Sequence, residues 1–168
     1  LNLAADEIDR LPVSDIILIA TPDDAITETA KKLATGLKRG SKEPTVVLHT
    51  SGALSSEVLS PLTKAGVFTG SIHPLVAVDQ NGESALRGSY YCVEGHRRAV
   101  ATAKQIVTDL GGESFDVNTE FKALYHAAAV IASPHLVALF DVALELMTTS
   151  GIKPAQARKI LLRLVKST

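Results

Sequence analysis

Short apolar runs alternate with amphipathic stretches along the first two thirds of the chain. Runs such as Val13 to Thr21 and Thr45 to Thr50 are bounded by turn residues, the pattern of strands buried on both faces of a sheet. The pattern predicts strands at 13–21, 45–50, 67–72, 89–94 and 113–117, and helices at 22–38, 55–64 and 99–110. Strands and helices in this alternation indicate an α/β fold with a mainly parallel sheet.

From Thr119 onward the pattern is helical only, so we expect an α/β half (1–118) followed by an all-helical half (119–168). The helical period places Lys122 and His126 one turn apart on one face. His135 falls on another face unless Pro134, which lacks an N–H, kinks the helix. A proton-handling pair on an otherwise apolar helix suggests a site.

Composition narrows the class of protein. The chain has 168 residues, of which 46% are apolar and 21% charged, as in soluble globular proteins. Its formal net charge is −1 and its basic residues form no stripe, which argues against nucleic acid or an anionic membrane surface as the main partner. The single cysteine, Cys92, forms no internal disulfide and fits a reducing cytoplasm.

The apolar segment 127–146 is long enough to raise the question of a membrane span. Pro134, His135, Asp141 and Glu145 interrupt it, so we expect a helix buried in the core or in a subunit interface. We therefore expect a homodimer formed through the helical half. The residues expected to be buried in it include Ile131, Leu139 and Phe140.

Small, hydroxylated or ionisable residues follow each of the first three predicted strands. In open parallel sheets, ligands bind beyond the carboxyl ends of the strands. We therefore expect a nucleotide cofactor at the ends of the first two strands, and His73-Pro74 beside it. The expected cofactor-binding residues are Thr21, Pro22, Asp23, Thr50, Ser51 and Gly52. The alternative is that these are ordinary turn and capping residues.

The dinucleotide fingerprint G-x-G-x-x-G, which lets a backbone approach a pyrophosphate, is absent. Either the site is not a dinucleotide site, or the first strand-helix-strand unit lies upstream of Leu1. The start at a residue other than methionine favours the second explanation. We therefore expect an incomplete Rossmann-like sheet, and a helical half that is also truncated.

Four segments together resemble one family: DIILIATPDDAI, VVLHTSGALSSEVL, IHPLVAV and EFKALYHAAAVIASPHLVAL. They are similar to bacterial Rossmann-like, NADP-binding, oxidoreductase-like proteins with a C-terminal domain of unknown function 2520. The resemblance covers the chain from Asp15 to Val165. It implies an N-terminal glycine-rich βαβ unit, and a helical domain like the C-terminal domain of 6-phosphogluconate dehydrogenase.

More distant resemblances suggest residue roles. The step from Lys122 to His126 is similar to the Lys-x-x-x-Asn step of β-hydroxyacid dehydrogenases and ketopantoate reductases, in which the lysine is a general acid or base. His73-Pro74 and Ser133-Pro134-His135 look like the His-Pro and Pro-His elements of prephenate dehydrogenases, in which such histidines contact the substrate. The resemblance thus implies that Ser133 and His135 bind substrate.

The resulting expectation is an NAD(P)-dependent oxidoreductase for a small carbonyl or hydroxy-acid substrate. Lys122, its pKa lowered by partial burial, donates the proton, and His126 polarises the substrate or relays that proton. Ser51 and His73 approach from the sheet side, in a cleft between the two halves.

Several alternatives stay open. Lys122 is alternatively a solvated first-turn lysine, and His126 and His135 are alternatively core histidines. A metal site lacks the H-E-x-x-H spacing, and a serine hydrolase lacks the G-x-S-x-G elbow around Ser51. The main competitor is a nucleotide-sensing or structural protein that has kept the fold without turnover.

Overall fold

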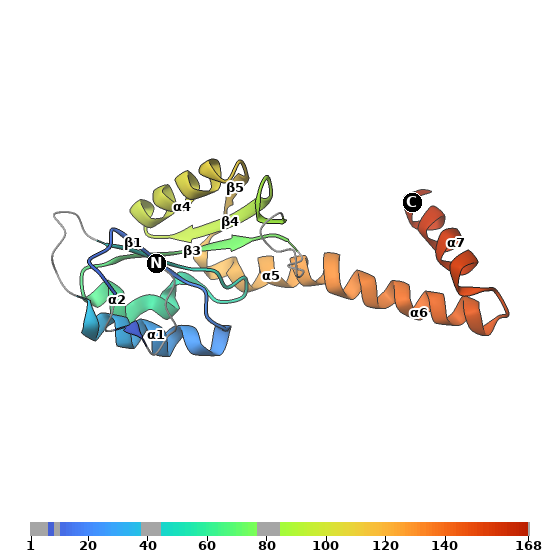
Figure 1. Ribbon diagram of the computed structural model, residues 1–168, viewed down its shortest axis with the longest axis horizontal. Coiled ribbons are helices and arrows are strands. Elements are labelled where there is room, and N and C mark those ends of the chain that lie inside the picture. Colours follow the sequence, from blue (N-terminus) through green and yellow to red (C-terminus); the bar gives the residue numbers. More distant parts are fainter. Residues whose placement is uncertain (1–6, 9–10, 38–44, 77–84, 168) are drawn as a thin grey trace. The chain divides into compact units, whose positions relative to one another are not determined.

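The computed structural model describes residues 7–8, 11–37, 45–76 and 85–167. Contacts within the chain divide it into two compact units, Leu1–His126 and Ala127–Thr168 (Figure 1). The first unit continues past the expected boundary at Asn118. Lys122 and His126 therefore pack with the α/β half.

A five-stranded sheet in the order β1-β2-β3-β4-β5 forms the centre of the first unit. Its strands are β1 (Ile16–Ile19), β2 (Val46–His49), β3 (Phe68–Pro74), β4 (Tyr90–Gly95) and β5 (Glu113–Asp116). Every neighbouring pair is parallel except β3 and β4, which are antiparallel. The predicted α/β class is confirmed. The antiparallel pair escaped prediction because the connection 75–89 is also long enough for a parallel crossover.

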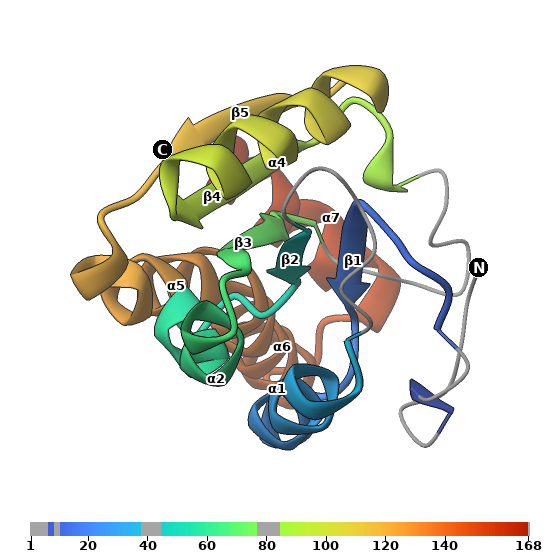
Figure 2. The ribbon, with the colours of Figure 1, turned by 90° about the vertical axis from the view of Figure 1, so that its left-hand side faces the viewer.

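Helices cover both faces of this sheet, as Figure 2 shows for α1 and α2 on one side and α4 on the other. One face packs Ile17, Ile19 and Val47 against α1 (Asp23–Gly36) and the adjoining helices η2 (Ser56–Leu59) and α2 (Ser60–Lys64). The other face packs against α4 (Arg97–Asp109). The predicted end of the first helix, Lys38, lies outside the described residues.

Strand β1 is not buried on both faces, contrary to the expectation from its apolar run. Ile17 and Ile19 are buried, but Ile16 is 46% exposed and Leu18 is 53% exposed. The reason is position: β1 lies at the edge of the sheet, and α4 packs on β2 to β5. An all-apolar run therefore does not distinguish a central strand from an edge strand with one uncovered face.

The third strand is longer than predicted. Instead of ending at Ile72, β3 continues through His73 and Pro74, which pair with Cys92 and Tyr91 of β4. Proline is tolerated there because it stands at the end of the strand. His73 therefore projects from a strand, a more rigid support than a loop.

The second unit contains a π-helical turn (Ile131–His135), α6 (Leu136–Thr149) and α7 (Pro154–Ser167), and α6 packs against α7. The π-helical turn accommodates Pro134. The helical run Thr119–Thr149 spans 31 residues with a hydropathy of 1.8, so it could cross a membrane by length and composition alone. A single such helix is weak evidence for a membrane protein.

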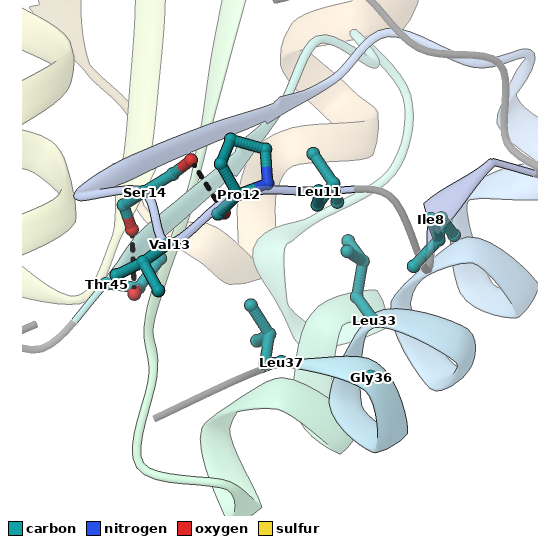
Figure 3. A pocket seen from close by; sticks show the side chains of 9 residues that line it. All are labelled: Ile8, Leu11, Pro12, Val13, Ser14, Leu33, Gly36, Leu37 and Thr45. Atoms are coloured by element: carbon teal, nitrogen blue, oxygen red, sulfur yellow. Dashed lines mark hydrogen bonds between the residues drawn. The ribbon is translucent and has the colours of Figure 1, made fainter. Parts of the chain in front are cut away.

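A small hollow lies before the amino ends of β1 and β2, lined mainly by apolar side chains from Ile8 to Leu37 (Figure 3). Its hydroxyl groups are satisfied locally: Ser14 Oγ donates to the Pro12 carbonyl at 3.1 Å, and Thr45 Oγ1 donates to the Ser14 carbonyl at 3.0 Å. The hollow therefore lies at the amino ends of the strands. Ligands of open α/β sheets are expected at the opposite, carboxyl ends.

Candidate functional site

Polar side chains line one face of the sheet at alternating positions of three buried strands. His49 of β2 pairs with Ser71 of β3, and Ser71 pairs with Glu94 of β4. His73 pairs with Cys92 in the same way. Directly paired residues point to the same face. This face therefore carries two adjacent polar rows beneath the helix that begins at Lys122.

Lys122 is the first residue of α5 (Lys122–Val130), and its ammonium reaches those rows. Nζ donates to Ser71 Oγ at 2.8 Å and to Cys92 Sγ at 3.8 Å. The residue is 1% exposed, which excludes the solvated first-turn lysine. Burial lowers the pKa of Lys122, and the charges of Cys92 and Glu94 oppose that shift only in part.

Tyr125 stands one turn after Lys122 and connects two strands. Its hydroxyl lies 2.9 Å from His73 Nδ1 of β3. The Phe115 ring meets the Tyr125 ring edge-on at 5.7 Å. Burial raises the pKa of Tyr125, so the phenol is protonated at neutral pH.

His73 and His126 meet at Gly52. Their rings are T-shaped with centroids 5.9 Å apart. A Cβ on Gly52 would lie 2.6 Å from His73 Nε2 and 2.5 Å from His126 Nδ1, so the position requires the absence of a side chain. Burial, with the nearby charges of Lys122 and His126, lowers the pKa of His73 to about 4. His73 is therefore neutral at pH 7.

Glu94 anchors the start of the α5 segment. One carboxylate oxygen accepts from the Ser56 backbone N–H at 2.9 Å. The other accepts from Ser56 Oγ at 2.8 Å and from Thr119 Oγ1 at 3.0 Å. These bonds join β4, the start of η2 and the 3-10 turn η3 (Thr119–Phe121) that precedes Lys122.

The Ser51 hydroxyl makes three hydrogen bonds within the chain. It donates to Asp23 Oδ2 at 2.9 Å and accepts from the backbone N–H groups of Ala53 and Leu54 at 3.2 and 3.0 Å. These bonds use all the hydrogen-bonding positions of a hydroxyl. In this conformation Ser51 organises the turn that carries Gly52.

His49 lies fully buried beside this turn. Its Nδ1 accepts from the Ser51 N–H at 3.2 Å, so the ring proton sits on Nε2. Among the residues that the structure describes, His49 Nε2, His126 Nδ1 and Thr21 Oγ1 are buried without a hydrogen-bond partner. Burial lowers the pKa of His49.

The residues expected to bind cofactor suit only part of a nicotinamide dinucleotide. The buried, unpartnered Thr21 hydroxyl at the end of β1 suits a polar, uncharged group. The first turn of α1 carries Asp23 and Asp24, and carboxylates there oppose a phosphate at this helix end. These residues therefore fit the ribose or nicotinamide portion and do not fit the diphosphate.

The remaining predicted residues divide between the two units. Thr50 follows β2, and its N–H donates to the Ile19 carbonyl at 3.2 Å; Pro22 stands at the N-cap of α1. Ser133 and His135 lie in the π-helical turn of the second unit, and both are exposed. Across the described ranges, no group of three His, Cys, Asp or Glu side chains is placed to hold a metal ion.

Sequence reasoning missed Ser71, Cys92, Glu94 and Tyr125. A signal for the first three was present, because each is a polar or thiol residue at an alternating position in a buried strand. Tyr125 follows Lys122 by three residues, a spacing that shares a helix face. What the sequence lacked was the register that brings these strands together.

Two family models match successive parts of the chain, and the second match begins within the sheet-containing unit. Residues 4–74 match the model of a Rossmann-like domain, and residues 89–168 match a domain of unknown function, DUF2520. The resemblance stated from the sequence is thereby confirmed. A search of curated proteins found no match.

Solved structures share the fold. Protein TM1727 from Thermotoga maritima is 28% identical with a TM-score of 0.71, covering 95% of this chain and 59% of that one. Plasmodium falciparum pyrroline carboxylate reductase, solved with NADP bound, is 12% identical with a TM-score of 0.68, covering 99% and 60%. Prephenate dehydrogenase from Aquifex aeolicus is 18% identical with a TM-score of 0.59, covering 96% and 66%. The chain thus spans about three fifths of the length of the first of these relatives.

Proposed function

We propose that this chain, a Rossmann-like half joined to a domain of unknown function 2520, belongs to a nicotinamide-dependent oxidoreductase acting on a small carbonyl or hydroxy-acid substrate. The observation that carries the proposal is that the His73 and His126 rings both approach Gly52. A neutral imidazole, His73, stands there with a buried lysine behind it. Reduction of a carbonyl requires a proton donor beside the developing alkoxide, and oxidation of an alcohol requires the reverse.

In this proposal His73 exchanges the proton with the substrate oxygen, and His126 and the Gly52 backbone shape the space beside it. Lys122 is too deeply buried to touch substrate, so it acts through its neighbours. A bound nicotinamide supplies or accepts the hydride. Ser133 and His135 stay candidates for substrate contacts from the second unit.

NADP or NAD is the proposed cofactor, held in part by Thr21 to Asp23 and Thr50 to Gly52. Two observations support it: the Rossmann-like match over residues 4–74 and a structural neighbour that was solved with NADP bound. Because the first turn of α1 carries Asp23 and Asp24, the diphosphate is expected to bind backbone N–H groups of a different segment. Strand β1 is the edge strand of the sheet formed by the described residues, and Ile16 and Leu18 are exposed on one of its faces, so a further strand and helix that supply this backbone would find room there.

We also propose a cytoplasmic location and a homodimer formed through the helical half. The buried, free thiol of Cys92 suits a reducing compartment. Large apolar side chains of the second unit, among them Ile131 at 63% and Leu139 at 68%, are exposed in the single chain.

A substrate screen tests the proposed activity. Oxidation of NADPH and NADH is followed with a panel of small 2-oxo acids, aldehydes and cyclic imines. His73→Asn and Lys122→Met should each lower turnover about 100-fold or more while leaving cofactor affinity unchanged. Lys104→Met is the matched control, because Lys104 is an exposed lysine paired with Asp116 on α4 and β5.

The competing function is nucleotide sensing or a structural role without turnover. Two observations favour it: the Ser51 hydroxyl is already hydrogen-bonded within the chain, and Lys122 is buried away from any substrate. Cofactor binding without oxidation of NADPH or NADH by any member of the panel, and without an effect of His73→Asn, would favour this alternative.

A further inference from the structure

Two neighbouring side chains of α5 meet the imidazole ring of His73. The Tyr125 and His126 rings both stand edge-on to it, each with its centroid 5.9 Å from that of His73 and with interplanar angles of 77° and 75°. One of the two contacts is also directional, because the Tyr125 hydroxyl lies 2.9 Å from His73 Nδ1. Tyr125 therefore distinguishes one ring atom of His73 from the others.

That distinction matters because an imidazole fits the same space in two ways. A half turn about the Cβ–Cγ bond exchanges Nδ1 with Cδ2 and Nε2 with Cε1, and the torsion at this bond is broad and roughly two-fold. The two orientations have nearly the same shape, so packing separates them poorly. A hydrogen bond to one nitrogen separates them, since a ring carbon does not replace it.

The Tyr125 hydroxyl makes this hydrogen bond in only one of the two orientations. In the structure Nδ1 faces the hydroxyl, and after a half turn Cδ2 would stand in its place. A phenol hydroxyl both donates and accepts, so it bonds Nδ1 whether or not that nitrogen carries a proton. The selection is therefore independent of the tautomer of His73 and of the direction of the bond.

The orientation decides which ring atom of His73 stands where beside Gly52. Nε2 lies 2.6 Å and Cε1 2.7 Å from the point where a Cβ on Gly52 would stand. A half turn would exchange these two atoms and put a carbon in the place of the nitrogen. A general acid or base acts only when its nitrogen is within hydrogen-bond reach of the reacting group.

The phenol ring that makes the selection is itself supported from the sheet. Phe115 of β5 meets the Tyr125 ring edge-on with centroids 5.7 Å apart, and the Lys122 ammonium lies 5.6 Å from the centroid of the same ring. Lys122 donates to Ser71, which lies on β3, the strand that carries His73. The contacts that hold Tyr125 thus lead back to the strand whose histidine it orients.

We propose that Tyr125 is a positioning residue of the site, whose hydroxyl selects the orientation of the His73 ring that places Nε2 beside Gly52, with Phe115 and Lys122 holding the phenol. The inference rests on the proposed function in one respect, that Nε2 exchanges a proton with the substrate. The selected orientation itself does not depend on that function. Lys122 then contributes to the site through the Tyr125 ring and without touching substrate.

Proton NMR recorded without cofactor or substrate tests the orientation in the unmodified protein. The His73 and Tyr125 ring signals are assigned by their loss in His73→Asn and Tyr125→Phe. Hε1 of His73 is next to Nδ1, and Hδ2 lies on the opposite edge of the ring. We therefore expect a stronger nuclear Overhauser effect from the Tyr125 Hε protons to Hε1 than to Hδ2. An equal or stronger effect at Hδ2 would overturn the inference, whether or not any variant folds.

Tyr125→Phe keeps the aromatic ring and removes the hydroxyl. One hydrogen bond favours an orientation by roughly 5-fold, so the ratio of the Hε1 effect to the Hδ2 effect should fall at least 2-fold in this variant. Tyr90→Phe is the matched control, because Tyr90 is an exposed tyrosine at the start of β4, and it should leave the His73 signals unchanged. A folded Tyr125→Phe protein with an unchanged ratio would show that the hydroxyl does not select the orientation.

The orientation and the activity are separable. A ratio that falls in Tyr125→Phe would establish the selection even if no nicotinamide chemistry is found. If the substrate panel gives turnover, Tyr125→Phe should lower kcat at least 5-fold and leave KM within about 2-fold, because the ring loses the bond that aims it at the reacting group. An unchanged kcat in Tyr125→Phe would contradict the positioning role and leave the proposed function intact.

Discussion

Gly52 is the residue on which the two site histidines converge, and its lack of a side chain is testable. A methyl group at Gly52 would stand closer to His73 Nε2 and His126 Nδ1 than side chains tolerate. We expect Gly52→Ala to cost about 1–3 kcal/mol of unfolding free energy, because the rings must shift in a packed site. Urea unfolding measures this cost.

A double-mutant cycle controls for general damage. In the His126→Ala background, Gly52→Ala should cost less, because one of the two crowded atoms has been removed. An equal cost in both backgrounds would contradict the convergence.

His73 also predicts how stability depends on pH. Its pKa is about 4 in the folded protein and 6.5 in the unfolded chain, so the unfolded chain binds more protons between these values. The stabilisation is fully present above pH 6.5, and it is lost as the pH falls from 6.5 towards 4. Buried His49, its pKa also lowered, acts in the same direction.

Urea unfolding at a series of pH values checks the dependence. The loss of stability between pH 6.5 and 4 should be shallower in His73→Asn than in the unmodified protein. Parallel curves for the two proteins would show that His73 titrates normally in the folded state.

Part of the site was predictable at this scale. The sequence singles out Lys122, His126 and His73 because each is unusual where it stands: a lysine and a histidine in an apolar helix, and a histidine just past a buried strand. Gly52 is expected at the site only as one of the small residues that follow the second predicted strand. The depth of Lys122 was not predictable, because its burial depends on Ser71 and Cys92, whose position beneath α5 depends on tertiary packing.

At the scale of elements, Glu94 joins β4 to η2 and to the turn before α5. Glu94→Gln removes the charge from three hydrogen bonds and turns one acceptor into a donor that faces donors. We expect a loss of about 1–3 kcal/mol in unfolding free energy, measured by urea titration.

Glu113→Gln is the matched control, because Glu113 is an exposed glutamate at the start of β5. It should change the unfolding free energy by less than about 0.5 kcal/mol. Equal effects of the two substitutions would mean that the Glu94 contacts add little to stability.

The elements themselves were largely predictable from the alternation of apolar runs and turns. Two features were not: the antiparallel direction of β4 and the exposure of one face of β1. Both features depend on which strand or helix lies next to the strand in the fold. The spacing of apolar residues along one strand carries no information about its neighbours. The extension of β3 through His73 is of the same kind, since pairing with β4 supports it.

At the scale of the whole molecule, the apolar surface of the second unit predicts self-association. We expect a mass twice the 17.7 kDa of the chain by light scattering at micromolar concentration. Leu139→Asp should shift the protein towards the monomer, because it places a charge on an exposed apolar side chain of α6.

Glu145→Asp is the control, since it keeps the charge of a position on the same helix. A monomer of 17.7 kDa for the unmodified protein would contradict the proposed dimer and leave the exposed leucines for another partner.

The central claim is that the site serves a nicotinamide dinucleotide. A fluorescence titration with NADPH and with NADH tests it most directly, on this chain and on the protein translated from its natural reading frame. The account predicts micromolar binding by the protein that supplies the diphosphate-binding backbone, weakened at least 10-fold when Gly52→Ala crowds the site. Binding of neither dinucleotide by either protein would contradict the account and point to a different ligand for His73 and Lys122.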